Sequence, residues 1–326
     1  MKTFLMLAAA AVATPPVKPA LAPSEIVAAV TASDWVAIAP ADLLVMDLAG
    51  GKRVIIQLMP PPFSQGWVGN IRKLAAAHWW DGTSINRVQD NYVVQWGDVT
   101  EKKVLPGGLA MVAGIEYTTE APAAFKLAVH DALEKRLSSM TKLVRQMGNT
   151  VVFPDSIANR DSYAGEALNW KGWPFGTSPL LPPTSDGSRV VWPVHCYGMV
   201  GVGRGMPPDT GTGAELYTVI GHAPRHLDRN IALVGRVISG IEHLSSLPRG
   251  TGDLGFYKTP EERTGITSVR IGTDVAGLPR YEYLSTESAS FAAYADARAN
   301  RRDPFFIHPA GGADICNIPV PVRVVK

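Results

Sequence analysis

The chain has 326 residues, of which 46% are apolar and 18% are charged, a composition typical of globular domains and too apolar for wholesale disorder. Lys and Arg number 31 against 29 for Asp and Glu, so net charge does not favour nucleic acid or an anionic membrane as the main partner. The 31 glycines and 26 prolines indicate many turns and favour strands over helices.

Residues 1–22 have the features of an export signal. Lys2 precedes an apolar run from Phe4 to Ala13 that is too short to span a bilayer, and small residues follow at Ala11–Ala13 and Ala20–Ala22. The alternative is an Ala/Pro-rich tail. We favour export to the periplasm and leave the cleavage point open. Because no other apolar run is long enough, we expect no membrane span.

Residues 43–98 predict two hairpins with a helix between them. Leu43–Leu48 and Arg53–Leu58 are strand-like and are joined through Gly50-Gly51. The stretch INRVQDNYVVQWGD, residues 85–98, predicts two short strands around a turn at Gln89–Asn91. The helix is predicted from apolar residues at helical spacing, with Ser64 as its N-cap and Asp81-Gly82 after its end: Trp67, Val68, Ile71, Leu74 and Ala75.

Strand-like patterns stop at about residue 120, and residues 120–190 are predicted to be an insertion. An amphipathic helix is predicted from the spacing of Val129, Leu133, Leu137, Met140, Val144 and Met147. The Pro/Gly/Trp-rich residues 168–187 that follow predict a long irregular loop.

Strand character returns after the insertion. HCYGMVGVGRG and AELYTVIG predict strands, and residues 231–248 predict a strand and a short helix. The C-terminal extension, 249–326, mixes strand-like residues 266–272 and 318–325 with a possible helix at 288–300. We expect the extension to pack on the main domain.

Cys196 and Cys316 are the only cysteines, and the sequence leaves open whether they pair or remain as buried thiols. GVGRG at 201–205 is not a dinucleotide loop, because prolines follow it where a helix would have to begin. His222 and His226 have a metal-like spacing, but Pro224 between them opposes a helix. We therefore expect no metal site and no cofactor.

In order along the chain, these segments resemble the cyclophilin family of peptidyl-prolyl cis-trans isomerases, over about residues 40–248. INRVQDNYVVQWGD is similar to the family's F-H-R-V-x-x-x-F-x-x-Q-x-G-D, YGMVGVG to its L-S-M-A-N, and TGAELYTVI to its G-S-Q-F-F-I. HLDRNIALVGRVISGIE is similar to W-L-D-G-x-x-x-x-F-G-x-V-x-x-G. The resemblance implies a mainly β fold: a closed eight-stranded antiparallel barrel capped by two helices, with the substrate groove on its outer wall.

The resemblance also implies site residues. Arg87 is the catalytic group and Gln95 holds the substrate backbone. The substrate-binding set is Tyr92, Gln95, Met199, Val200, Gly201, Glu215, Tyr217, His226 and Leu227. The chain departs from the family in three places: Glu215 replaces a glutamine, Val200-Gly201 replace Ala-Asn, and Ile231 replaces a histidine.

We therefore predict an exported isomerase that acts as a monomer on proline-containing polypeptides, without a cofactor, and assists protein folding in the cell envelope. A cyclophilin-like module that binds proline-containing segments with little turnover is the alternative, favoured by the three departures and the long insertion. The co-occurrence of Arg87, Tyr92 and Gln95 favours the enzyme.

Overall fold

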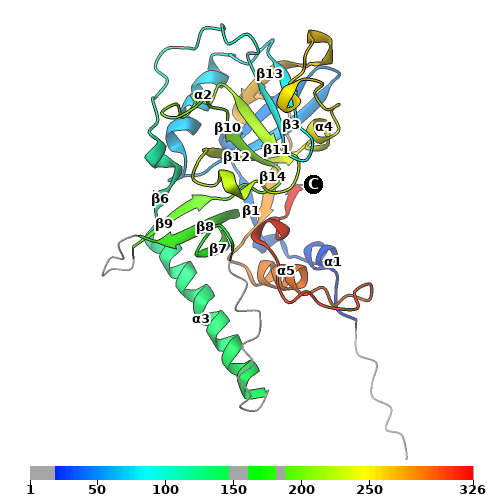
Figure 1. Ribbon diagram of the computed structural model, residues 1–326. Coiled ribbons are helices and arrows are strands. Elements are labelled where there is room, and N and C mark those ends of the chain that lie inside the picture. The colour runs from blue at the N-terminus through cyan, green and yellow to red at the C-terminus, as the bar shows by residue number, and fades with distance from the viewer. Residues whose placement is uncertain (1–18, 147–160, 181–187, 326) are drawn as a thin grey trace, which may run out of the picture.

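The computed structural model describes residues 19–146, 161–180 and 188–325, with the side chains of 136–146 left out. Its upper part in Figure 1 is a closed barrel in which eight antiparallel strands follow the order β10-β11-β5-β4-β13-β2-β3-β12. This confirms the predicted mainly β barrel. The barrel strands are β2 (Leu43–Leu48), β3 (Lys52–Leu58), β4 (Ser84–Val88), β5 (Val93–Gly97), β10 (Met199–Val202), β11 (Leu216–Val219), β12 (Leu233–Ser239) and β13 (Thr264–Ile271).

The β2–β3 hairpin is buried on both faces, which explains its nearly continuous apolar sequence. Leu44 and Met46 point into the barrel core. Leu43, Val45 and Ile55 alternate with the core residues and form a second cluster on the outer wall. The hairpin therefore joins the barrel to the structure packed outside it.

Two helices close the barrel, on opposite sides in Figure 1. Helix α2 (Gln65–Ala76) buries the five apolar residues from which it was predicted. Ser64 does occupy its N-cap position, but with φ of 53° and no side-chain capping bond. Short helix α4 (Glu242–Ser245) buries Leu244 in the same core.

The insertion forms a second, four-stranded sheet of order β6-β9-β8-β7 below the barrel, so the prediction of an irregular loop at 168–187 is wrong for its described residues. Lys171 and Gly172 have φ of 47° and 81°, the left-handed pair of a tight hairpin turn. The flanking aromatic residues bury together instead of lying exposed in a loop. The elements are β6 (Thr119–Glu120), α3 (Ala123–Gln146), β7 (Glu166–Trp170), β8 (Trp173–Pro179) and β9 (Arg189–Pro193).

The predicted helix of the insertion is present as α3. Phe125 and Val129 pack into the core, and Leu133 packs against it. The predicted apolar positions Leu137, Met140 and Val144 belong to the side chains left out, and Met147 lies outside the described residues.

The two ends of the described chain meet in a three-stranded sheet of order β1-β14-β15. Trp35, Leu284, Phe291 and Tyr294 form the cluster between this sheet and two helices. The elements are α1 (Pro23–Ala28), β1 (Trp35–Ile38), β14 (Tyr281–Leu284), α5 (Ala289–Ala299) and β15 (Val322–Val324).

The expected boundary at residue 248 needs correction, because β13 comes from the segment assigned to the extension and closes the barrel between β4 and β2. Barrel strands therefore run from Leu43 to Ile271. The rest of the extension does pack on the barrel wall, with Tyr281 in the cluster of Leu43 and Ile55.

Cys196 and Cys316 form a disulfide with α-carbons 5.1 Å apart, which settles the choice that the sequence left open. It ties the C-terminal segment to the chain just before β10. Among the described residues, no helix has both the length and the apolarity to cross a membrane. Residues 1–18, which carry most of the expected signal, lie outside them.

Candidate active site

Arg87 lies on β4, directly opposite Gln95 on β5. Its Nη1 donates to Gln95 Oε1 at 3.0 Å, its Nε donates to the Leu254 carbonyl at 2.8 Å, and its Nη2 donates to Gln89 Oε1. Burial lowers the pKa of Arg87 from its usual value, yet a guanidinium stays protonated at neutral pH. The result is a fixed, half-buried cation on the outer wall of the barrel.

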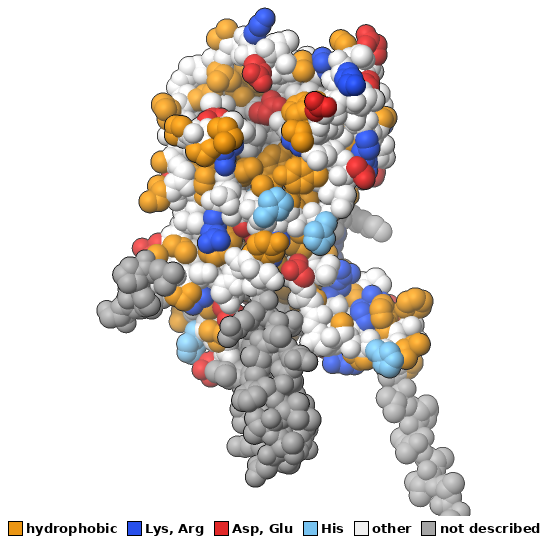
Figure 2. Space-filling view, in the orientation of Figure 1, with side chains coloured by type: hydrophobic (Ala, Val, Ile, Leu, Met, Phe, Trp, Pro, Cys, Tyr) orange, Lys and Arg blue, Asp and Glu red, His pale blue; other side chains and the backbone are white. Residues whose placement is uncertain are grey.

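A pocket of about 210 Å³ opens beside Arg87; most of its lining residues are apolar, and Gln95 and Arg204 add polar groups to it. Figure 2 shows hydrophobic side chains gathered in a hollow over the β10–β11 face of the barrel. The Arg87 guanidinium lies 5.7 Å from the centre of the Tyr92 ring at the pocket edge. The apolar lining comes from Tyr92, Val93, Tyr217, Leu227, Ile231 and Phe256. The structure thus brings Arg87, Tyr92, Gln95, Tyr217 and Leu227 together, as the sequence predicted.

Phe256 is a site residue that sequence reasoning missed. It forms a β-bridge with Arg87, and its ring centre lies 5.2 Å from the guanidinium. Its loop can lie close against β4 because Gly255 has no side chain. A Cβ at this position would come within 2.7 Å of Gln89 Cα. The glycine-rich run RGTGDLGFY was a usable signal for such a close approach, but it fell beyond the expected end of the domain.

Met199, Val200 and His226 were predicted in the substrate-binding set but do not line this pocket. Met199 and Val200 sit on β10, whose register with β12 shifts after Val200 because β12 carries an extra residue there, Val234. Both side chains are buried in the core cluster, and Met199 also lines a different pocket beside the disulfide. His226 is exposed next to Leu227.

Gly201 contributes space instead of a contact. It pairs with Tyr217 across β10 and β11, and a Cβ at this position would come within 2.3 Å of the Tyr217 ring. The absence of a side chain at Gly201 therefore lets the Tyr217 ring lie against β10.

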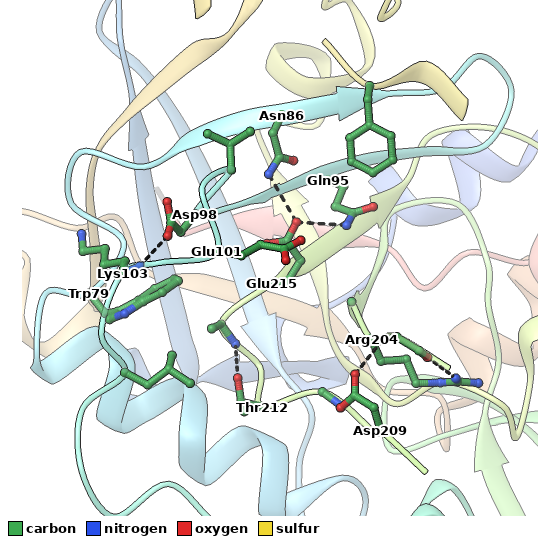
Figure 3. A pocket seen from close by; sticks show the side chains of 17 residues that line it. Trp79, Asn86, Gln95, Asp98, Glu101, Lys103, Arg204, Asp209, Thr212 and Glu215 are labelled. Carbon is green, nitrogen blue, oxygen red and sulfur yellow. Dashed lines mark hydrogen bonds between the residues drawn. The ribbon is translucent and has the colours of Figure 1, made fainter. Parts of the chain in front are cut away.

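Glu215 lines a larger pocket of about 640 Å³, which shares Gln95 and Phe256 with the pocket beside Arg87 (Figure 3). Its Oε1 accepts from Gln95 Nε2 at 3.0 Å and from Asn86 Nδ2 at 3.3 Å. Burial raises the pKa of Glu215 to about 7, outweighing the two hydrogen bonds that lower it. Arg87, Gln95 and Glu215 thus form one chain of hydrogen bonds along the groove.

A buried polar network holds Tyr217 from below. Its hydroxyl lies 2.8 Å from His195 Nε2, and His195 Nδ1 lies 2.9 Å from Asp228 Oδ1. Burial lowers the pKa of His195, so the ring is neutral. Its Nδ1–H donates to Asp228 Oδ1, and its Nε2 therefore accepts from the Tyr217 hydroxyl. Arg225 joins Asp228 to Asp161 of the insertion through hydrogen bonds of 2.6 to 2.9 Å. None of these residues except Tyr217 was among the predicted site residues.

A closed eight-stranded barrel with an arginine and an apolar pocket on its outer wall defines the cyclophilin class of protein. Residues 66–271 match the family model for cyclophilin type peptidyl-prolyl cis-trans isomerase/CLD. The chain therefore belongs to the cyclophilin type peptidyl-prolyl cis-trans isomerase family, as the sequence motifs predicted.

Among solved structures, the chain is similar to the cyclophilin AquaCyp293 from Hirschia baltica, with 20% identity, a TM-score of 0.62, and coverage of 90% of this chain and 94% of that one. This likeness shows the fold and extends over most of the chain, including the parts outside the barrel. A cyclophilin type isomerase from Cryptosporidium parvum, solved in the presence of the dipeptide Ala-Pro, shares 10% identity with a TM-score of 0.37, covering 70% of this chain and 98% of its own. No curated protein matches the sequence significantly.

Proposed function

We propose that this chain is a peptidyl-prolyl cis-trans isomerase that acts, as a monomer, on X-Pro bonds of polypeptides in the cell envelope. The observation that carries the proposal is the Arg87 guanidinium, fixed at the edge of an apolar pocket that suits a proline ring. Five N–H groups belong to a guanidinium, and three protein acceptors use three of those on Arg87. Two N–H groups remain for a substrate.

The reaction requires neither a nucleophile nor a proton transfer. Amide resonance holds the X-Pro bond behind a barrier of about 18–20 kcal/mol, and the resonance is lost when the bond twists. The apolar pocket fixes the proline ring while the preceding residue rotates. Arg87 donates to the prolyl nitrogen as its lone pair returns, or to the flanking backbone, and so stabilises the twisted state more than the planar one. Each tenfold acceleration needs about 1.4 kcal/mol of such preference.

The Cys196–Cys316 disulfide supports the envelope address. Disulfides persist in oxidising compartments such as the periplasm and are rare in the reducing cytosol. The apolar run at Phe4–Ala13 supports the same address through its likeness to an export signal. In that compartment, X-Pro bonds of newly exported proteins would be the substrates.

NMR exchange spectroscopy on an Ala-Pro peptide tests the proposal with three proteins: wild type, Arg87→Ala and Arg53→Ala. Arg53 is a matched control because it is an arginine on the same barrel, exposed and paired with Asp47. We expect wild type and Arg53→Ala to accelerate cis–trans exchange equally and Arg87→Ala to lose most of the acceleration. Equal acceleration by all three proteins would remove Arg87 from the mechanism.

A binding module with little turnover is the second candidate. The observation that favours it is that Arg87 already contacts the Leu254 carbonyl and the Phe256 ring. These contacts use part of the guanidinium before a substrate binds. In that case wild type would not accelerate exchange, but the peptide would still cause chemical-shift changes around Tyr92 and Leu227.

A further inference from the structure

A second pocket, of about 370 Å³, lies on a different wall of the barrel. It is bounded by β10 and β12 on one side and by the C-terminal segment and the disulfide on the other, and it shares no lining residue with the apolar pocket beside Arg87. Tyr197, half exposed, stands at its rim. Its apolar wall includes Ile238, Ile315, Ile318, Val320 and Val322.

A buried cation forms part of this mostly apolar pocket. Arg236 is only 8% exposed and packs its guanidinium 4.5 Å from the centre of the Trp173 ring. Its Nε and Nη2 donate to Gln57 Oε1, at 3.0 and 2.8 Å, and its Nη1 donates to the Gly172 carbonyl at 2.6 Å. Burial lowers the pKa of Arg236 to about 10, so the side chain is still charged at neutral pH.

Arg236 has no counter-ion among the described residues. None of the ion pairs among residues 19–146, 161–180 and 188–325 includes it. Its three hydrogen bonds go to neutral oxygens and leave two of the five N–H groups of a guanidinium for another acceptor. Because a buried charge is costly unless it is paired, a lone guanidinium in a pocket wall favours an anionic ligand.

An unsatisfied acceptor lies in the same wall. Asn169 lines the pocket, and its Oδ1 is buried without a hydrogen-bond partner, while its Nδ2 reaches the Ile318 carbonyl at 3.4 Å. Buried amide oxygens are nearly always bonded in native proteins, so this oxygen calls for an N–H or O–H donor. A plain aliphatic carboxylate would pair with Arg236 and leave Asn169 Oδ1 unsatisfied.

We propose that this pocket binds the C-terminal end of a polypeptide whose last side chain is apolar. The terminal carboxylate pairs with Arg236, the amide N–H of the last residue donates to Asn169 Oδ1, and the last side chain packs on the isoleucines and valines of the wall. The volume is near the lower end of that of small-ligand sites, which suits one or two terminal residues. This second peptide site goes beyond the proposed isomerase and does not rest on it.

Three small probes separate the contributions: N-acetyl-leucine has the carboxylate, the N–H and the branched side chain; N-acetyl-leucinamide lacks the carboxylate; and 4-methylpentanoate lacks the N–H. Titrated into the full mature chain and followed by methyl NMR, N-acetyl-leucine should bind tightest. We expect the amide to bind at least tenfold more weakly and 4-methylpentanoate severalfold more weakly. The shifting methyl groups should be those of Ile238, Ile318 and Val322.

Two variants complete the experiment. Arg236→Met should weaken N-acetyl-leucine binding at least tenfold, to the level of the amide, whereas Arg53→Met should leave it unchanged. Asn169→Ala should bring N-acetyl-leucine down to the affinity of 4-methylpentanoate, and this comparison stands if Arg236→Met fails to fold. Equal binding of acid and amide, no binding of the acid at millimolar concentration, or shifts centred on Leu227 and Ile231 would each overturn the proposal.

Discussion

Two arginines on different walls of the barrel have nearly the same local partners. Arg87 on β4 and Arg236 on β12 each face a glutamine on the neighbouring strand, Gln95 and Gln57. Each donates to that glutamine and to a backbone carbonyl in a loop, and each packs against aromatic rings. The local partners of the two arginines are nearly the same. The two sites differ in the structure that packs over each arginine.

The open wall leaves Arg87 half exposed beside a pocket, whereas the appended sheets bury Arg236. The same local arrangement therefore places one arginine beside an open groove and the other, largely buried, in the wall of a second pocket. Exposure decides the role more than the first neighbours do.

The largest expected effect is a loss of stability on the covered wall, where the C-terminal segment and the disulfide pack against β10 and β12. Replacing Cys196 and Cys316 by serine opens a loop of 120 residues and should lower the free energy of unfolding by about 3–5 kcal/mol. Urea denaturation of the double variant against the oxidised wild type measures this. Isomerase activity at a temperature where both are folded should change less than twofold; a large loss would mean that the covered wall shapes the groove.

Replacing the arginine on each of the two walls by methionine tests the comparison directly. Arg87→Met should lower the isomerase rate roughly 100-fold, about 2.7 kcal/mol in the barrier, and change unfolding by under about 1 kcal/mol. Arg236→Met leaves Gln57 Oε1 and the Gly172 carbonyl without a donor, so it should cost about 1–3 kcal/mol of stability. Its isomerase rate should stay near wild type. The reverse pattern would contradict the assignment of the two roles.

On the open wall, Glu215 gives a pH-dependent effect. Because its folded-state pKa of about 7 lies above the ordinary 4.5 of a glutamate, the folded protein keeps a proton that the unfolded chain releases. The stability from protonated Glu215 is fully present below pH 4.5 and is lost as pH rises through 7, by roughly 2–3 kcal/mol. Glu215→Gln should match wild type at pH 4.5 and be more stable at pH 8. Parallel stability–pH curves for the two proteins would refute the raised pKa.

The smallest expected effect is at Tyr217, where the groove meets the buried network. Tyr217→Phe keeps the ring in the pocket but leaves His195 Nε2 without its hydroxyl partner, at a cost of about 1 kcal/mol of stability. The isomerase rate should fall less than threefold, because the ring and not the hydroxyl lines the pocket. Thermal unfolding and NMR exchange of this single variant measure both quantities.

The sequence predicted what is local in the chain. Residues 85–98 contain both strands and the turn between them, so the pairing of Arg87 with Gln95 follows from a short hairpin. The helix over the barrel end was equally predictable, because its buried residues recur at helical spacing within one segment.

What depends on register or on distant segments was not predictable. The surroundings of Met199 and Val200 depend on how β10 pairs with β11 and β12, and Phe256 reaches Arg87 from a loop far along the chain. In the insertion, the residues around the Lys171-Gly172 turn are also common in irregular loops, so the sequence did not predict a hairpin. Only the burial of the aromatic residues distinguishes a sheet there.

The position of β13 has a consequence for how the chain is made. Strands β2 and β4 both pair with β13, whose first residue, Thr264, follows Ser84 by about 180 residues. At roughly 5–20 residues per second, synthesis leaves about 10–40 s between β4 and its partner. For that time the two strands have free edges, which are prone to pair with other chains. The barrel can therefore close only after its last strand has emerged.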